Sequence, residues 1–285
     1  MNAVDSYPFP SFMHGTMLAV DSPGYQWREE PPIDLESDEF LRSENPWYVL
    51  AAVFERAKHG DHSNTGRLLY FLRLCSEAAL TDKLSAALGV TAPRSQLRML
   101  RLLLGEKHSL PAVLFGSLYS SLASAHELWV VPELLDVYLS DRVDEFSVVS
   151  SSLSDILEDA PGEIYDAKED DTGYRALVMA RFEELRDRFG TDEVAVTRGQ
   201  PVEVEAVALR LRQIFLQEHR MSAEAMYTRM LLEAFTGLDC RAFYKGDRFQ
   251  PLSAVAVLED FLDHADLSGY RPGVRYFFGH PVPAE

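Results

Sequence analysis

The residue types best suited to metal chemistry gather in one short stretch, where the sequence reads His59, Gly60, Asp61, His62. Imidazole nitrogens and carboxylate oxygens are ligands of zinc, so this order could supply part of a metal site. No Cys-x-x-Cys motif, no His-Glu-x-x-His motif and no second ligand group lies nearby in the sequence. A charged turn after a helix contains the same residue types, and we therefore expect no bound metal and no cofactor.

Motifs of phosphate binding and of nucleophilic catalysis are incomplete or missing. The segment from Gly105 to Ser109 contains glycine, lysine and serine without the spacing of a phosphate-binding loop, and it follows a helix where that loop follows a strand. No Gly-x-Ser-x-Gly elbow occurs, and nothing in the sequence around Cys75 or Cys240 indicates an activated thiol. With 45 acidic residues in the chain, a pair of carboxylates says little about acid-base catalysis. We expect that the protein is not an enzyme, and an active site assembled from distant residues is the alternative.

Negative charge is concentrated in one part of the chain. The formal net charge is −18, and residues 133–193 hold 18 acids against 6 bases. Such a field repels nucleic acid and anionic lipid and attracts basic proteins. We predict that acids of this region bind a partner: Asp141, Asp144, Glu145, Glu158, Asp159, Glu163, Asp166, Glu169, Asp170 and Asp171. A solvated linker between two halves of the chain is the alternative interpretation of the same residues.

Helical signals fill the chain from residue 45 onward. Apolar residues recur at intervals of three and four, and capping residues, prolines and glycines mark the ends of the helices. The expected helices are 46–60, 64–80, 81–89, 93–105, 109–125, 132–140, 145–158, 173–189, 202–220, 223–235 and 252–266. Strand character is confined to 194–197 and 274–278, which are too short to support a sheet.

These helices predict an all-α fold of consecutive antiparallel pairs, a HEAT-like α-solenoid with a non-helical N-terminal arm and a C-terminal tail. The arm, residues 1–44, contains prolines and aromatic residues that we expect to pack on the body. The rest divides into a helical-pair region at 45–160, an acidic connecting segment at 161–172 and a C-terminal helical region with the aromatic tail at 173–285. No strict residue pattern recurs between the pairs, so an ordinary two-lobed helical domain is the alternative.

The tail from Tyr270 to Pro283 concentrates aromatic residues and arginines, which dominate binding hot spots. We expect it to fold back on the last helix pair. The alternative is an exposed apolar patch that binds a partner.

The chain has no run of about 18 uncharged apolar residues, and its first ten residues lack the basic flank and apolar core of a signal peptide. We expect a cytoplasmic protein that does not enter a membrane. Cys75 and Cys240 each lie beside an apolar run and are expected to be buried free thiols.

Three segments of the second half carry a family resemblance. They are Phe-Thr-Gly-Leu-Asp-Cys-Arg-Ala-Phe at 235–243, residues 249–261, and Tyr-Arg-Pro-Gly-Val-Arg-Tyr-Phe-Phe-Gly-His-Pro-Val-Pro at 270–283. Together with residues 132–158, they resemble HEAT-like immunity proteins of bacterial polymorphic toxin systems, over residues 45–283. The resemblance implies a cytoplasmic antidote that binds a cognate protein toxin and blocks it, without shared catalytic residues.

The acidity and the resemblance lead to one expected function, an immunity protein that neutralises a basic toxin and binds neither nucleic acid nor membrane directly. The alternative function is a HEAT-like scaffold or adaptor for a partner that is not a toxin. A toxin gene immediately beside the gene for this chain would distinguish the two. The sequence leaves the oligomeric state open.

Overall fold

The structure is a computed structural model that describes residues 7–13, 30–74, 78–105, 116, 119, 121–139, 146–158, 162–167, 171–246 and 248–285. Helices dominate these residues, and strands occur there only as two-residue antiparallel pairs. The all-α prediction is therefore confirmed. The apolar residues at intervals of three and four explain it, since this spacing gives each helix one face to bury.

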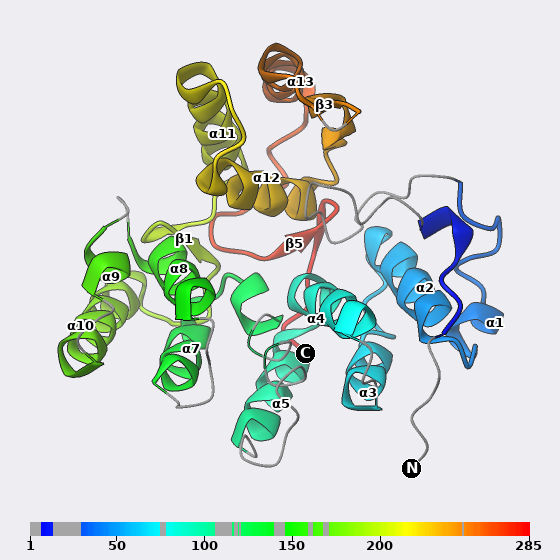
Figure 1. Ribbon diagram of the computed structural model, residues 1–285, viewed down its shortest axis with the longest axis horizontal. Coiled ribbons are helices and arrows are strands. Elements are labelled where there is room, and N and C mark those ends of the chain that lie inside the picture. The colour runs from blue at the N-terminus through cyan, green and yellow to red at the C-terminus, as the bar shows by residue number, and fades with distance from the viewer. Residues whose placement is uncertain are drawn as a thin grey trace. The chain divides into compact units, whose positions relative to one another are not determined.

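The chain divides into two compact units (Figure 1). Unit 1 contains Met1–Asn64, Glu203–Pro272 and Tyr276–Val282, and unit 2 contains Thr65–Val202, Gly273–Arg275 and Pro283–Glu285. The described residues of the segment 161–172 belong to unit 2 together with the helices on both sides of it.

Unit 1 is built around three helices of the second half of the chain. Its elements are η1 (Ser11–Met13), α1 (Asp38–Leu41), α2 (Pro46–Lys58), α11 (Val204–Glu218), α12 (Ala223–Thr236), η4 (Cys240–Phe243), β3 (Tyr244–Lys245), β4 (Arg248–Phe249), α13 (Pro251–His264), β5 (Tyr276–Phe277) and β6 (His280–Pro281). Helix α11 packs against both α12 and α13. Ser222 caps α12 by accepting a hydrogen bond from the amide of Ala225, and Gly237 ends it in the left-handed conformation, as the sequence predicts.

The described part of the N-terminal arm lies on α2. The ring of Phe9 meets the ring of Trp47 at 4.6 Å, and the side-chain amide of Asn45 donates to the carbonyl of Pro8 at 2.8 Å. The same Asn45 caps α2 by accepting from the amide of Trp47. The arm is expected to be non-helical because of its prolines, but it contains the one-turn helix α1.

The part of the aromatic tail that belongs to unit 1 forms a tight hairpin of β5, which is buried, and β6, which is exposed. Phe277 is fully buried with its ring 5.0 Å from that of Phe54 in α2. The amides of Phe278 and Gly279 donate to the carbonyls of Ala234 and Phe235, which would otherwise be unpaired at the end of α12. The tail therefore folds back, as expected, and it contacts both α12, which belongs to the last helix pair, and α2.

Unit 2 holds α3 (Gly66–Leu74), α4 (Ala78–Thr91), α5 (Arg94–Gly105), η2 (Leu128–Val130), α7 (Val131–Tyr138), α8 (Phe146–Leu157), α9 (Glu163–Asp166), α10 (Asp171–Phe189), β1 (Val196–Thr197) and β2 (Gln200–Pro201). Its helices follow one another in chain order from α3 to α10 (Figure 1). Helix α3 packs on α4 and α7 on α8, while α10 contacts both α7 and α8.

The prediction of a short helix at 81–89 is wrong at both ends, because α4 runs through Thr81 and Gly89. A side chain at Gly89 would place its Cβ 2.5 Å from the carbonyl oxygen of Ser121. The glycine therefore allows close packing between α4 and the helical residues 121–124, and the helix ends only before Pro93.

Within the described parts of the chain, no helix combines the length and the apolar character needed to span a bilayer.

Candidate functional site

Three of the ten predicted partner-binding acids have described side chains: Glu158, Glu163 and Asp166. Asp171 begins α10, but its side chain lies outside the described part of the chain. The other six also lie outside the described residues: Asp141, Asp144, Glu145, Asp159, Glu169 and Asp170. The three described acids lie close together in sequence, at the end of α8 and in α9.

Glu158 is a buried acid that holds α9 in place. Its carboxylate accepts hydrogen bonds from the amides of Ile164 and Gly162 and from the hydroxyl of Ser154. A carboxylate that receives the free amides at the start of a helix caps that helix and compensates its positive end. Because both oxygens are used inside the protein, we assign Glu158 a positioning role in place of the predicted partner contact.

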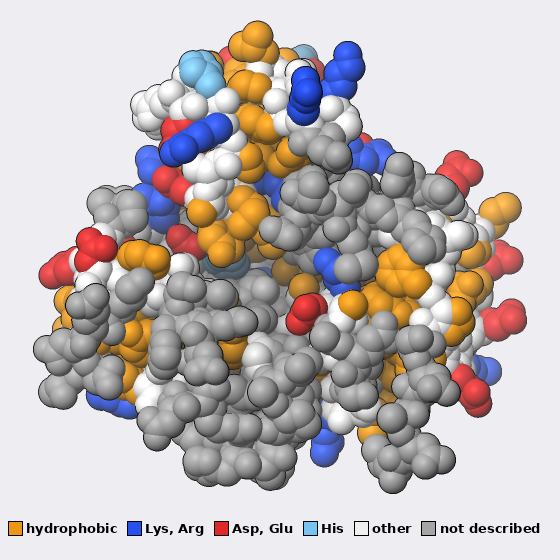
Figure 2. Space-filling view, in the orientation of Figure 1, with side chains coloured by type: hydrophobic (Ala, Val, Ile, Leu, Met, Phe, Trp, Pro, Cys, Tyr) orange, Lys and Arg blue, Asp and Glu red, His pale blue; other side chains and the backbone are white. Residues whose placement is uncertain are grey.

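The outer side of α9 presents two acids and an aromatic residue. Ile164 is buried and anchors the turn, whereas Glu163, Tyr165 and Asp166 are exposed. Neither Glu163 nor Asp166 forms an ion pair or accepts a side-chain hydrogen bond among the residues described. In the space-filling view, acidic and apolar side chains stand side by side over α9 (Figure 2). We call Glu163, Tyr165 and Asp166 the α9 surface.

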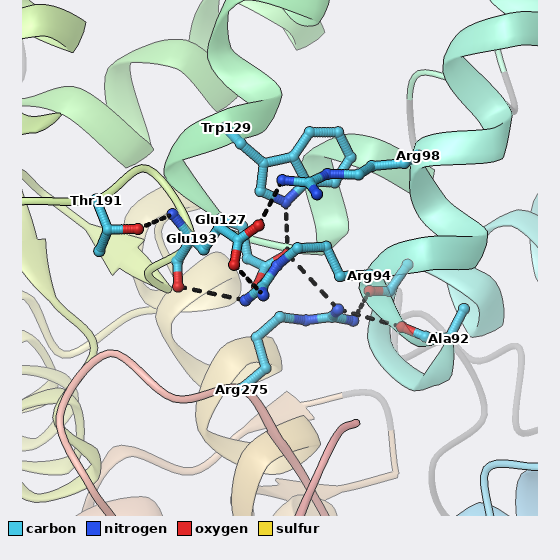
Figure 3. A network of polar contacts seen from close by, with 9 residues as sticks. Ala92, Arg94, Arg98, Glu127, Trp129, Thr191, Glu193 and Arg275 are labelled. Carbon is cyan, nitrogen blue, oxygen red and sulfur yellow. Dashed lines mark hydrogen bonds and ion pairs between the residues drawn. The ribbon is translucent and has the colours of Figure 1, made fainter. Parts of the chain in front are cut away.

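A second arrangement of charged groups, which the sequence analysis missed, lies inside unit 2 around Glu127 (Figure 3). Glu127 is 1% exposed and meets Arg94 of α5 at 2.5 Å and Arg275 of the tail at 3.8 Å. The indole N–H of Trp129 donates to the same carboxylate at 2.6 Å. Glu193, in the loop after α10, joins the network at 3.0 Å from Arg94 and 2.6 Å from Arg98.

The network ties together parts of the chain that are far apart in sequence. Arg275 donates to the carbonyls of Gly89 at 2.7 Å and Ala92 at 3.1 Å, which lie at the end of α4. It therefore reaches from the tail to the first helices of unit 2, as Figure 3 shows. No local motif signals such a site, because Glu127 finds its partners 33 and 148 residues away.

The charges of this network stabilise the fold by compensating one another inside the protein. Burial alone would raise the pKa of Glu127, but the charge of Arg275 and the hydrogen bonds from Arg94 and Trp129 outweigh burial and lower it. Glu127 is therefore ionised near neutral pH and its oxygens are occupied, so it does not serve as a general base there. Burial, reinforced by the charge of Arg275, lowers the pKa of the neighbouring His126 to about 4 and keeps its ring neutral.

Other residue types that could act as nucleophiles or metal ligands have structural surroundings. Burial, together with the charge of Glu233, raises the pKa of the Cys240 thiol well above its usual range, which makes this thiol unreactive at neutral pH. Asp61 accepts hydrogen bonds from Ser63, and His59 lies 3.4 Å from Glu36. Among the described residues, no three His, Cys, Asp or Glu side chains are grouped so that they could hold a metal ion. Cys75 lies outside the described part.

No protein-family model, curated protein or solved structure matches this chain.

Proposed function

We propose that this protein is an immunity-type inhibitor, which binds a basic protein toxin in the cytoplasm and covers its active surface. The observation that carries the proposal is the α9 surface, where two exposed acids flank a tyrosine and have no ion-pair partner among the described residues. The buried carboxylate of Glu158 fixes the backbone of this turn. A preorganised surface loses less conformational entropy when it binds.

The chemistry of the α9 surface suits a cationic protein. Carboxylates without internal partners steer a basic protein toward them and form charge-assisted hydrogen bonds with its lysines and arginines. Tyrosine supplies a large contact area with few rotatable bonds, which is why it is common at binding hot spots. The predicted acids on both sides of α9, from Asp141 to Asp171, would extend the surface and raise its negative potential.

The proposal includes a HEAT-like arrangement of unit 2. It is supported by the contacts between helices that are neighbours in sequence, α3 with α4 and α7 with α8. Such an array buries the faces of successive pairs against each other and leaves its turns available for recognition.

The test is a comparison of three immobilised proteins used to capture the partner from the native host. They are the wild type, the double variant Glu163→Lys with Asp166→Lys, and the control Glu205→Lys with Asp263→Lys. The control reverses two exposed acids of unit 1 that form no ion pair with the described residues, and so changes the net charge equally. We expect the wild type and the control to retain the same basic protein, and the α9 variant to lose it. Equal retention on all three would contradict the proposed surface.

Co-expression then separates an inhibitor from a scaffold. If the captured protein is a toxin, its expression arrests growth, and the wild-type chain restores growth while the α9 variant does not. A captured protein that is harmless when expressed alone would favour the scaffold or adaptor and contradict the inhibitor.

A further inference from the structure

A second surface of unit 2 has the opposite charge. Residues 65–105 contain six lysines and arginines against two acids, in a chain whose net charge is −18, and two of the six, Arg94 and Arg98, pair with Glu127 and Glu193. On the outer faces of α3 and α5, three apolar side chains are unusually open to solvent. Tyr70 is 60% exposed, Leu74 50% and Met99 53%. Large apolar side chains that are exposed together mark interaction sites more often than isolated ones do.

Two arginines share the outer face of α3 with Tyr70 and Leu74, because residues three, four and seven apart lie on one side of a helix. Arg67 and Arg73 lie on α3, and neither forms an ion pair or donates a side-chain hydrogen bond to any residue that the structure describes. Arg98 on α5 is half exposed; its guanidinium donates to Glu193 and lies over the ring of Trp129, 5.5 Å from the ring centroid. A hydrogen bond from Thr65 to Gln96 brings the beginnings of α3 and α5 together. We call Arg67, Tyr70, Arg73, Leu74 and Met99 the α3–α5 face.

The α3–α5 face and the α9 surface are chemically complementary. The first presents arginines and exposed apolar side chains, and the second presents carboxylates beside a tyrosine; within the described part of the chain, neither Arg67 and Arg73 nor Glu163 and Asp166 form ion pairs. Both belong to unit 2, where α3 and α9 lie at opposite ends of the row of helices (Figure 1). Because they are at opposite ends, one surface meets the other most readily in a second molecule.

We infer that the α3–α5 face binds the α9 surface of a second copy of this chain. When two copies align in opposite directions, each acidic end meets a basic end and the contact forms twice. A two-fold pair of this kind is closed and needs no third copy. The contact involves few residues, so we expect a weak dimer with a dissociation constant on the order of 10–100 μM at low salt.

This inference uses the surface of the proposed function but does not depend on a basic partner. A dimer covers the α9 surface, so a basic protein that binds there would separate the two copies. The arginine variant described below distinguishes the two ideas, because it removes the dimer contact and leaves the α9 surface intact.

The test uses purified full-length chain in sedimentation experiments over protein concentrations of about 5–200 μM, at low and high salt. One variant, with Arg67→Glu and Arg73→Glu, makes the α3–α5 face acidic. The other, with Glu163→Arg and Asp166→Arg, makes the α9 surface basic. We expect the wild type to dimerise with rising concentration and to dissociate in salt. Each variant alone should be monomeric, because its two surfaces then carry charge of the same sign.

The decisive step is to mix the two variants in equal amounts. In a mixed dimer, the reversed α3–α5 face of one variant meets the reversed α9 surface of the other, and the two unreversed surfaces meet each other. Both contacts then join opposite charges, so the mixture should form a dimer again. The control Arg248→Glu with Arg271→Glu, two exposed arginines of unit 1, should dimerise like the wild type. A wild type that stays monomeric at low salt, or variants whose mixture stays monomeric, would overturn the inference.

Discussion

At the scale of single residues, the stability of unit 2 depends on Glu127. A carboxylate that is 1% exposed remains charged only because two arginines and an indole N–H surround it. The loss of one member of a buried ion pair leaves the others without compensation, which costs more than the pair itself contributes. The half-exposed Glu193 shares Arg94 but is solvated, so its ion pairs contribute far less.

The change Glu127→Gln removes the buried charge while keeping the size of the side chain. We expect it to lower the free energy of unfolding by about 3–5 kcal/mol, because Arg94 and Arg275 lose their buried counter-charge. The matched change Glu193→Gln should cost less than about 1 kcal/mol. Urea denaturation at pH 7 measures both. Similar losses for the two variants would show that Glu127 does not hold the network together.

His126 should make the stability of the protein depend on pH. Its pKa is about 4 in the folded protein against 6.5 as the ordinary value, so the unfolded chain binds the proton more tightly. Stability is therefore complete above pH 6.5 and falls as the pH drops from 6.5 toward 4, by up to about 3 kcal/mol.

The variant that isolates this effect is His126→Asn, because residue 126 has φ of 52° and asparagine tolerates the left-handed region. The difference in unfolding free energy between pH 6.5 and pH 4.5 should be smaller in the variant than in the wild type. An identical pH dependence of the two proteins would refute the role of His126.

At the scale of elements, Gly89 in α4 shows that a glycine after an apolar stretch can either end a helix or lie inside it. In the sequence, Gly89 follows a helical stretch and indicates its end, since glycine commonly ends helices. In the structure it lies inside α4, where the missing Cβ leaves room for the carbonyl of Ser121. The sequence alone does not distinguish a glycine that ends a helix from one that allows close packing inside it, because the packing partner Ser121 lies 32 residues away.

The change Gly89→Ala should therefore destabilise the protein, by about 1–3 kcal/mol, although alanine favours helix formation. The control is Gly66→Ala at the start of α3, where a new Cβ would be 3.8 Å from its nearest neighbour. That change should be neutral or slightly stabilising. Thermal unfolding of the two variants compares them directly, and a stabilising effect at Gly89 would show that the close contact with Ser121 is absent.

Most helices could be predicted because their signals are local. The Asn45-Pro46 start of α2 and the Ser222 and Gly237 caps of α12 appear in the sequence where the structure places them. The hairpin of β3 and β4 and the one-turn α1 were missed, since elements of two to four residues carry no period to detect. The burial of Glu158 was missed for a different reason: an acid that caps a helix looks the same in sequence as its exposed neighbours.

At the scale of the whole molecule, the distribution of charge is the feature on which the proposed function rests. The sequence locates the acidic region correctly, but it does not show which acids face outward. The fold separates Glu158, which holds α9, from Glu163 and Asp166, which are exposed. It also places Arg67 and Arg73, which have no ion pair with any described residue, at the other end of the same unit, a contrast that the net charge of −18 conceals.

The most direct test measures the affinity of the captured basic protein for the chain at about 50 and about 300 mM salt. For the wild type we predict weaker binding at the higher salt, because exposed charges on both partners are screened. The Glu163→Lys, Asp166→Lys variant should bind about tenfold or more weakly at low salt, with a smaller dependence on salt. An affinity and a salt dependence equal to those of the wild type would contradict recognition through the α9 surface.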